Sequence, residues 1–432
     1  MKPPHGPGAD PTVRRQRLTR PEDTSTAYHL SVLEGPDAGL NVTLDGSSPT
    51  RALLGTSPVC TVRLTDPEVS RRHAAIAVTT DHVQIVDLGS TNGTTVNGVV
   101  IKEASLYGGE VIRIGRSVVS LQRGEERPAN VGLATSFGRI VGESIAMRRL
   151  YPVLEKLAGL ERPVLLEGET GTGKELVAEE LHRASKRADA PFIVLESSAI
   201  PTDQLVGHLF GTPEEPGLVD RAKGGVLFID EIGDLPRHAQ KKLRDVITAS
   251  TDVRLLAATR HDLDKDVTAG RFDEALFFEL ASGRIELPPL RDRQGDVTVL
   301  AKHFWNELAM STPNTATGKN PELPIDLLPR FEQYPWPGNV RELRSVVVQR
   351  ATFGELSKTY LSDKARDQGL DFMSAVIQDD LPFPTARDRV VTEFERRYVE
   401  RVLARHGGNV TAAARASGVA HRYFQLVRAR VR

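Results

Sequence analysis

The chain has 432 residues, a length that predicts two to four domains rather than one. With 39% hydrophobic residues, 26% charged residues and a formal net charge of −1, it has ordinary globular composition and no overall bias toward nucleic acid. Cys60 is the only cysteine, which excludes a disulfide framework and a multi-thiolate zinc site and suits a reducing, cytoplasmic location. No apolar run approaches about 18 residues, so we expect no transmembrane helix and no membrane partner.

The first part of the chain divides into a tail, a β domain and a linker. Residues 1–26 are rich in Pro, Arg and Asp and lack an apolar stretch, which predicts a disordered tail. Residues 27–123 consist of short Val, Ile, Leu and Thr runs separated by turn signals at intervals of roughly 8–12 residues, a spacing typical of an all-β sandwich. Residues 124–136 have the composition of a linker.

The remainder alternates between α/β and helical patterns. Over residues 137–287, apolar runs such as Val164-Leu-Leu alternate with helical stretches, which predicts a parallel α/β sheet. Residues 288–353 are mostly helical, residues 354–384 form a second linker, and residues 385–432 are helical again.

A glycine-rich loop lies between a predicted strand and a predicted helix. Its glycines allow backbone N–H groups to turn toward phosphate oxygens, Lys174 adds a positive charge, and the helix N-terminus contributes its dipole. Glu175 stands where a Ser or Thr usually touches Mg²⁺. We predict a phosphate-binding loop, the alternative being a glycine-rich turn without a ligand. The candidate binding residues of the loop are Gly168, Glu169, Thr170, Gly171, Thr172, Gly173, Lys174 and Glu175.

A second predicted strand, Val226-Leu-Phe-Ile, ends in Asp230 and Glu231. Two acids at the carboxyl end of a buried strand are costly unless they serve a metal or a water. We predict that Asp230 holds Mg²⁺, directly or through water, and that Glu231 polarises an attacking water as the second catalytic residue. The alternative is a solvated strand end.

Three further motifs extend this pattern: Gly142-Glu143-Ser144, Leu287-Pro-Pro-Leu-Arg-Asp-Arg293 and Trp336-Pro-Gly-Asn-Val-Arg-Glu-Leu343. Together with the loop and the paired acids they resemble the AAA+ domain of sigma-54-dependent transcriptional activators, over about half the chain. The resemblance implies an ATP-binding α/β core with a helical lid, assembled as a ring, and sigma-54 RNA polymerase as a partner. It also implies that Arg341 reaches the nucleotide phosphates, an ion pair with Glu342 being the alternative.

The chain departs from this family where the family contacts sigma-54. Leu209-Phe-Gly211 is followed by ten residues, ending at Arg221, that lack the family's Gly-Ala-Phe-Thr-Gly-Ala loop and have the composition of a short surface turn. Two asparagines of the family are replaced as well, by Glu196 after the second strand and by Arg260 in the Ala-Thr-Asn motif.

Further departures concern the arginines that this family supplies to the nucleotide of a neighbouring subunit. Both positions are acidic here, Asp273 and Glu279. Loss of such an arginine typically costs about 10³–10⁵ in rate. Arg271 and Arg284 are nearby in sequence as displaced substitutes. We therefore expect that ATP is bound but hydrolysed poorly, and that sigma-54 remodelling is impaired.

The β domain carries its own motifs, Val69-Ser70-Arg71-Arg-His73, Asp87-Leu-Gly-Ser-Thr91-Asn92-Gly93 and Val96-Asn97-Gly98. They resemble the forkhead-associated (FHA) domain, which binds phosphothreonine peptides on loops at one end of a β-sandwich. A phosphate dianion requires hydroxyl, guanidinium and amide donors, and the resemblance assigns them to Ser70, Arg71, Thr91 and Asn92. It implies that His73 braces the loop, and Thr56 replaces an expected arginine. The alternative is a scaffold without a ligand.

The C-terminal segment is basic, since residues 385–432 contain 11 Arg, no Lys and 4 acidic residues, a local charge of +7. Two predicted helices joined at Gly418 resemble the Fis-type helix-turn-helix, whose second helix enters the major groove of duplex DNA. The alternative is a helical hairpin that only packs on the ring. The candidate DNA-binding residues are His421, Arg422, Tyr423, Gln425 and Arg428. An upstream helix offers a dimer face of Val391, Phe394, Tyr398 and Val402.

These inferences predict a multidomain, cytoplasmic transcription regulator with an all-β FHA-like sandwich, an α/β P-loop AAA+ core with a helical lid, and an all-α helix-turn-helix domain. The expected cofactors are ATP and Mg²⁺. The expected partners are duplex DNA, a phosphothreonine-containing protein and copies of the chain itself, from a dimer to a ring. Three hypotheses remain: a DNA-binding regulator that binds ATP without remodelling sigma-54, a fully active ATP-driven activator, and a phosphopeptide adaptor with a vestigial core. The departures favour the first.

Overall fold

A computed structural model describes the chain from residue 24 to residue 353 and parts of the C-terminal segment. The first range omits residues 49, 80–81, 130, 250–251, 312–322 and 324–326, and the C-terminal part comprises residues 391, 398–399, 401–403, 405–406, 410–417 and 424. The chain divides into two compact units, Met1–Ala351 and Thr352–Arg432. No helix in the described part is long and apolar enough to cross a membrane.

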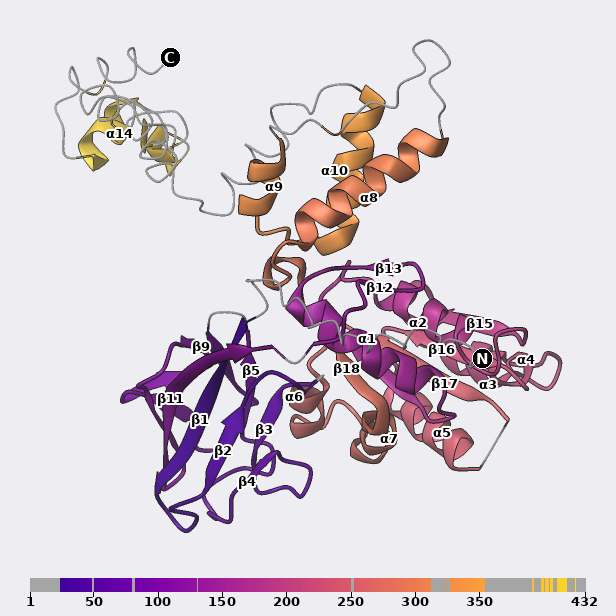
Figure 1. Ribbon diagram of the computed structural model, residues 1–432, viewed down its shortest axis with the longest axis horizontal. Coiled ribbons are helices and arrows are strands. Elements are labelled where there is room, and N and C mark those ends of the chain that lie inside the picture. The colour runs from indigo at the N-terminus through magenta and orange to yellow at the C-terminus, as the bar shows by residue number, and fades with distance from the viewer. Residues whose placement is uncertain are drawn as a thin grey trace, which may run out of the picture. The chain divides into compact units, whose positions relative to one another are not determined.

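The first domain of the larger unit is a β-sandwich (Figure 1). One sheet has the strand order β2-β1-β11-β10-β7-β8 and the other β4-β3-β5-β6-β9. Alternate residues point inward, so that Tyr28 and Leu30 of β1 share one apolar core with Ile76 and Ile85 of the facing sheet. The strands are β1 (Thr24–Glu34), β2 (Asn41–Leu44), β3 (Ala52–Gly55), β4 (Val62–Arg63), β5 (Ala74–Val78), β6 (Val83–Asp87), β7 (Thr94–Val96), β8 (Val99–Ile101), β9 (Glu103–Leu106), β10 (Val111–Ile114) and β11 (Ser117–Pro128).

The first and last strands of the sandwich are longer than the sequence predicts. β1 begins at Thr24, inside the range predicted as a tail, and β11 ends at Pro128, inside the range predicted as a linker. The two strands are antiparallel neighbours whose register runs out to Thr24 opposite Pro128. Backbone pairing between distant segments therefore overrides the polar composition from which the tail and linker were predicted.

The second domain contains a five-stranded, all-parallel sheet of order β15-β16-β17-β14-β18. Its alternating residues face two cores, because Leu166 lies in a cluster with α1 and α2 whereas Leu165 lies in a cluster with α3, α4, α5 and α7. The elements are β12 (Ser136–Phe137), β13 (Ile140–Val141), α1 (Ile145–Ala158), β14 (Val164–Glu167), α2 (Lys174–Arg183), β15 (Phe192–Glu196), α3 (Leu205–Phe210), α4 (Leu218–Arg221), β16 (Val226–Asp230), α5 (Arg237–Thr248), β17 (Arg254–Thr259), α6 (Leu263–Thr268), α7 (Glu274–Leu280) and β18 (Arg284–Glu286).

Three helices follow the sheet: α8 (Asp296–Ser311), α9 (Leu328–Gln333) and α10 (Asn339–Phe353). Trp336 is fully buried and packs edge-on against the rings of Phe331 and Tyr334. In the second unit, α14 (Val410–Ala416) is described, and Ala413 and Ala414 bury with Val399 and Phe424. The predicted fold classes, an all-β sandwich, an α/β core with a helical lid and a small helical domain, are thus confirmed.

Candidate functional site

The glycine-rich loop connects β14 to α2, as predicted. Gly168, Gly171 and Gly173 have φ values of +152°, +81° and +104°, which side-chain-bearing residues rarely adopt. No side chain caps the first turn of α2, and a Cβ added to Gly173 would meet nothing within 4 Å. Uncapped amide groups at a helix N-terminus beside open space fit a phosphate group.

Lys174, at the end of the glycine-rich loop, is buried and hydrogen-bonded to the loop backbone. The side chain is 7% exposed, and Nζ donates to the carbonyl oxygens of Gly168 at 2.8 Å and Glu169 at 3.1 Å. Burial lowers the pKa of Lys174, whereas Glu231 and Asp230 act in the opposite direction through their charge. The ammonium group therefore lies in the field of both acids at the end of β16, and the structure brings the two motifs together.

Two threonines and the exposed Glu175 complete the loop. Thr172 is buried and its hydroxyl donates to the carbonyl of Glu169 at 2.9 Å, whereas Thr170 is exposed. Glu175 lies in the first turn of α2, where an acidic side chain interacts favourably with the helix dipole.

The lid reaches this loop at the position of Arg341. The backbone N–H of Arg341 donates to the carbonyl of Gly171 at 3.3 Å, and the Arg341 charge contributes to lowering the pKa of Lys174. The carboxylate of Glu342, the alternative partner, accepts instead from the N–H of Gly338 at 2.8 Å and from the hydroxyl of Tyr334 at 3.3 Å. The backbone of Arg341 thus lies next to the glycine-rich loop.

Three residues that hold the loop were not assigned a role from the sequence. Asn339 donates to the carboxylate of Glu169 at 3.1 Å, Arg291 forms two bonds to that carboxylate at 2.6 and 2.8 Å, and Arg293 donates to the carbonyl of Thr172 at 2.9 Å. The sequence offered one indication of these contacts, the acidic residue Glu169 within the loop, which favours a cationic partner such as Arg291. These contacts fix the backbone of the loop from outside.

Asp230 and Glu231 end β16 in a cluster of carboxylates. Burial, followed by the charge of Glu231, raises the pKa of Asp230, and Glu196 adds to this effect. Glu196 lies opposite Asp230 in the register of β15 and β16. Glu231 is 7% exposed and has a φ of +56°, a left-handed conformation that is strained for a residue with a side chain. Crowded carboxylates beside Lys174 are the donor set that Mg²⁺ prefers.

Arg260 engages the proposed catalytic acid. Its backbone N–H donates to Oε2 of Glu231 at 3.0 Å, and its Nη1 lies 3.4 Å from Oε1 of the same side chain. Its other guanidinium nitrogen, Nη2, contacts Asp234 at 3.4 Å. Both carboxylate oxygens of Glu231 therefore face donors of Arg260.

A group of side chains that could hold a metal ion consists of Glu231, Asp234 and His261. However, His261 already uses both ring nitrogens, with Nε2 at 2.9 Å from Asp234 and Nδ1 at 3.2 Å from Asp266. Ion pairs and hydrogen bonds within the chain account for this cluster.

Asp273 and Glu279, the acids at the positions where the sequence resemblance predicts arginines, have different surroundings. Asp273 is 7% exposed and caps α7, because its side chain accepts the N–H of Leu276 at 2.9 Å. Its own N–H donates to Gln240 at 2.8 Å. Glu279 is exposed on the same helix. Asp273 thus has a structural role that an arginine cannot fill.

Both arginines considered as displaced substitutes pair with acids of the same domain. The guanidinium of Arg271 forms two bonds to Asp266, at 2.9 and 2.5 Å. Arg284 has a side chain only 8% exposed and is paired with Glu167 and, at 2.7 Å, with Asp264. Arg284 is therefore held within the core, whereas the Arg271 side chain is 66% exposed and its ion pair is weak.

The segment after α3 forms a short exposed turn. The N–H of Thr212 donates to the carbonyl of Glu215 at 2.9 Å, and α4 begins at Leu218. Residues 212–216 are all exposed. This matches the surface turn that the prolines and glutamates predict.

The four predicted phosphopeptide residues lie on two neighbouring loops of the sandwich. The hydroxyl oxygen of Ser70 accepts from the N–H of Thr91 at 3.1 Å, and Asn92 donates to the carbonyl of Glu68 at 2.8 Å. Arg71, Thr91 and Asn92 are exposed. The structure thus places hydroxyl, amide and guanidinium groups together at one end of the sandwich.

His73 joins these loops from the interior. Its Nδ1 accepts the N–H of Ser70 at 3.1 Å, so Nε2 carries the proton and donates to the carbonyl of Gly93 at 3.1 Å. The ring is fully buried, and burial lowers its pKa. Thr56, at the missing arginine position, adjoins the same loop because its N–H donates to the carbonyl of Ser70 at 3.2 Å.

The predicted DNA-binding residues all lie outside the described residues. Of the predicted dimer face, Phe394 also lies outside them, Val391 and Tyr398 are 42% and 40% exposed, and Val402 packs partly buried against the small helical core.

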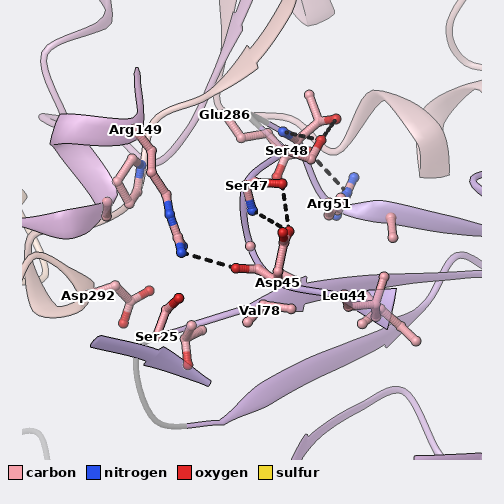
Figure 2. A pocket seen from close by; sticks show the side chains of 18 of the residues that line it. Ser25, Leu44, Asp45, Ser47, Ser48, Arg51, Val78, Arg149, Glu286 and Asp292 are labelled. Atoms are coloured by element: carbon pink, nitrogen blue, oxygen red, sulfur yellow. Dashed lines mark hydrogen bonds and ion pairs between the residues drawn. The ribbon is translucent and has the colours of Figure 1, made fainter. Parts of the chain in front are cut away.

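A cavity of about 390 Å³ lies between the sandwich and the α/β core. The sandwich contributes Asp45 and Ser47, and the core contributes Arg149, Glu286 and Asp292. Figure 2 shows Arg149 reaching across to Asp45, whose carbonyl accepts from Nη2 at 3.0 Å. None of its lining residues belongs to the glycine-rich loop. The cavity lies at the interface between the two domains, which we call the seam.

Comparison with known proteins identifies each domain. The family model of the Sigma-54 interaction domain matches residues 140–286, and that of the FHA domain matches residues 52–115. The model of the AAA+ ATPase lid domain matches residues 291–363, and the model described as "Bacterial regulatory protein, Fis family" matches residues 390–422.

Two relatives match over most of their length. The DNA-binding transcriptional regulator NtrC of Azospirillum brasilense is 34% identical over 338 residues, 68% of this chain and 69% of the relative. The transcriptional regulatory protein ZraR of Klebsiella oxytoca is 36% identical over 315 residues, again 68% and 69%. A crystal structure of NtrX from Brucella abortus in complex with ATP is 28% identical, covers 69% of this chain and 70% of its own, and has a TM-score of 0.48. The chain belongs to the sigma-54-dependent transcriptional regulators and combines FHA, AAA+ and Fis-type helix-turn-helix domains.

Proposed function

We propose that this regulator binds duplex DNA and ATP, takes a phosphothreonine signal through its FHA domain, and hydrolyses ATP poorly. The observation that carries the proposal is a contrast within one site. The glycine-rich loop has Lys174 and an uncapped helix N-terminus, whereas the carboxylate of Glu231 is engaged by Arg260 and an expected arginine position is occupied by the helix cap Asp273.

The loop residues support binding of ATP with Mg²⁺. The N-terminus of α2 and Lys174 would hold the phosphates, Asp230 would hold Mg²⁺ directly or through water, and Arg341 approaches from the lid. Bound ATP supplies a γ-phosphate that can be transferred to water. Glu231 would orient that water, and Arg260 competes with the water because it already contacts both oxygens of Glu231.

DNA binding is supported by the Fis-family match and the local charge of +7 over residues 385–432. The relative NtrC is itself described as DNA-binding. Remodelling of sigma-54 is less well supported, because the exposed turn at residues 212–216 lies where the sequence resemblance expects the sigma-54-contact loop and lacks its Gly-Ala-Phe-Thr-Gly-Ala motif. Family membership favours the rival, a fully active ATP-driven activator, and a phosphopeptide adaptor with a vestigial core is the second rival.

Nucleotide binding is tested by titrating the full chain with a fluorescent ATP analogue and Mg²⁺. We expect saturable binding that Lys174→Ala abolishes, because this change removes the buried ammonium group from the loop. Lys186→Ala, at an exposed position beyond α2, is the matched control and should bind as the wild type does. Absence of binding in the wild type would favour the adaptor.

A further inference from the structure

Arg71, one of the predicted phosphopeptide residues, is engaged by an acid of the AAA+ core. Its Nη2 lies 2.8 Å from Oε1 of Glu274, and its Nη1 donates to Oε2 at 3.2 Å. Glu274 is the first residue of α7. A carboxylate held by two guanidinium nitrogens occupies the donors that a phosphate would use. Arg71 therefore cannot serve Glu274 and a phosphopeptide in this way at the same time.

The Arg71–Glu274 pair is held in place by a buried contact elsewhere between the two domains. The pair itself is 70% and 50% exposed, and an exposed pair adds little by itself. Arg51 of the sandwich is only 15% exposed. It donates to both carboxylate oxygens of Asp262, at 3.0 and 2.6 Å, and to Asp264 at 3.1 Å. In Figure 2, Arg51 and Glu286 meet at the same seam, with Nε and Oε1 3.4 Å apart.

The acids on the core side of this seam need the sandwich for charge balance. Glu167, Asp264 and Glu286 all pair with Arg284, a single guanidinium of the core. Arg51 supplies a second positive charge to this cluster. Buried carboxylates without a partner are strongly unfavourable. The acidic core face is therefore complementary in charge to the basic sandwich surface that covers it.

An aromatic contact lies between the cluster and the exposed pair. The guanidinium of Arg72, next to Arg71 in the chain, lies 4.5 Å from the ring centre of Phe277 on α7. Phe277 also lies beneath the guanidinium of Arg284, at 5.5 Å. The loop that carries Ser70 and Arg71 is thereby aligned along the helix that carries Glu274.

We propose that the core face formed by α6, α7 and β18 is a docking surface for the FHA domain of the same chain, and that Glu274 closes the phosphothreonine site until a phosphopeptide displaces it. The proposal rests on phosphothreonine recognition as the proposed function of the FHA domain. Since Glu274 and a phosphate compete for Arg71, docking lowers peptide affinity, and by linkage peptide binding weakens docking.

The test is fluorescence anisotropy on the full chain, with a labelled peptide pool that has a fixed phosphothreonine and randomised flanking positions. Glu274→Gln removes the competing charge and keeps the shape of the side chain. Because an exposed ion pair is worth about 0.2–1 kcal/mol, we expect the phosphopeptides to bind roughly 1.5- to 5-fold more tightly to this variant than to the wild type. Glu279→Gln changes an exposed acid on the same helix and should leave the affinity unchanged.

A second variant distinguishes docking from a local charge effect. Arg51→Gln disrupts the buried cluster without touching the predicted phosphate-binding residues, and it should also tighten phosphopeptide binding. In the wild type, amide hydrogens of α7 should exchange faster once the peptide pool is added.

Two results would overturn the inference, and they differ in what they leave standing. Equal phosphate-dependent affinity in the wild type, Glu274→Gln and Arg51→Gln, with binding lost in Ser70→Ala, refutes closure by Glu274 and keeps phosphothreonine recognition. No preference for the phosphorylated over the unphosphorylated pool in any variant refutes both.

Discussion

At the scale of single residues, Arg260 most changes what the nucleotide site can do. It stands where the sequence resemblance leads us to expect an asparagine, and it contacts both oxygens of Glu231 and one oxygen of Asp234. Arg260 thereby uses lone pairs of Glu231 that would otherwise help to orient a water molecule. Arg260 therefore adds a barrier to hydrolysis without obstructing the phosphate-binding loop.

We expect Arg260→Asn to speed hydrolysis while leaving nucleotide affinity unchanged. The guanidinium is 46% exposed, so the pair is worth at most about 1 kcal/mol and the gain should not exceed about fivefold. Phosphate release under single-turnover conditions, at equal nucleotide occupancy, measures the effect. Arg237→Asn, at an exposed position near the start of α5, is the control. An unchanged or slower rate would show that Arg260 does not restrain Glu231.

His73 gives the FHA loops a dependence on pH. Its Nδ1 can accept from Ser70 only while the ring is neutral, and burial lowers the pKa of the folded-state ring below its usual 6.5. Between these two pKa values the unfolded chain binds a proton that the folded chain does not. Stability therefore rises with pH in this window and falls as the pH drops below about 6.5.

We predict that residues 69–73 lose amide protection when the pH is lowered from about 7.5 to about 5.5, after correction for intrinsic exchange rates. His73→Gln supplies the same acceptor and donor without titrating, so its protection should not change with pH. Hydrogen exchange with mass spectrometry resolves the segment. Equal loss of protection in the wild type and the variant would assign the effect to another group.

At the scale of elements, α7 serves two purposes that conflict with an arginine finger. Asp273 caps its N-terminus and Glu274 faces the sandwich. Losing such a cap costs about 1 kcal/mol, so replacing Asp273 with Arg would loosen the helix as well as introduce the guanidinium. Asp273 and Glu274 are therefore explained by contacts within the chain, whereas Glu279 is exposed on the same helix.

The predicted helix-turn-helix leads to an expectation about DNA affinity. Arg422→Ala should weaken binding to a specific duplex by about 1–3 kcal/mol if the side chain reads a base, and a truncation ending at Asp380 should lose binding. Gel-shift or anisotropy titrations at physiological salt measure both. Arg387→Ala, upstream of the predicted motif, is the control for charge. Equal affinity of the wild type and the truncation would contradict the assignment of DNA binding to this segment.

At the scale of the whole molecule, the motifs that could be predicted from the sequence are local ones. The phosphate-binding loop, the acids Asp230 and Glu231 and the FHA loops each lie within a few consecutive residues, and their turn and strand chemistry fixes their structure. By contrast, Arg51 and Asp262 are 211 residues apart in the sequence, and no helical or strand periodicity relates them. Such a contact depends on how two domains pack, which residue patterns do not encode.

We predict that the nucleotide site binds ATP but hydrolyses it slowly, and the decisive measurement is the steady-state ATPase rate as a function of protein concentration. Nucleotide occupancy is measured in the same samples. Where arginines come from a neighbouring subunit, activity per subunit rises as subunits assemble. With Asp273 and Glu279 at those positions, the account predicts low turnover at full occupancy that stays constant with concentration. Robust turnover per subunit that rises with protein concentration would contradict it.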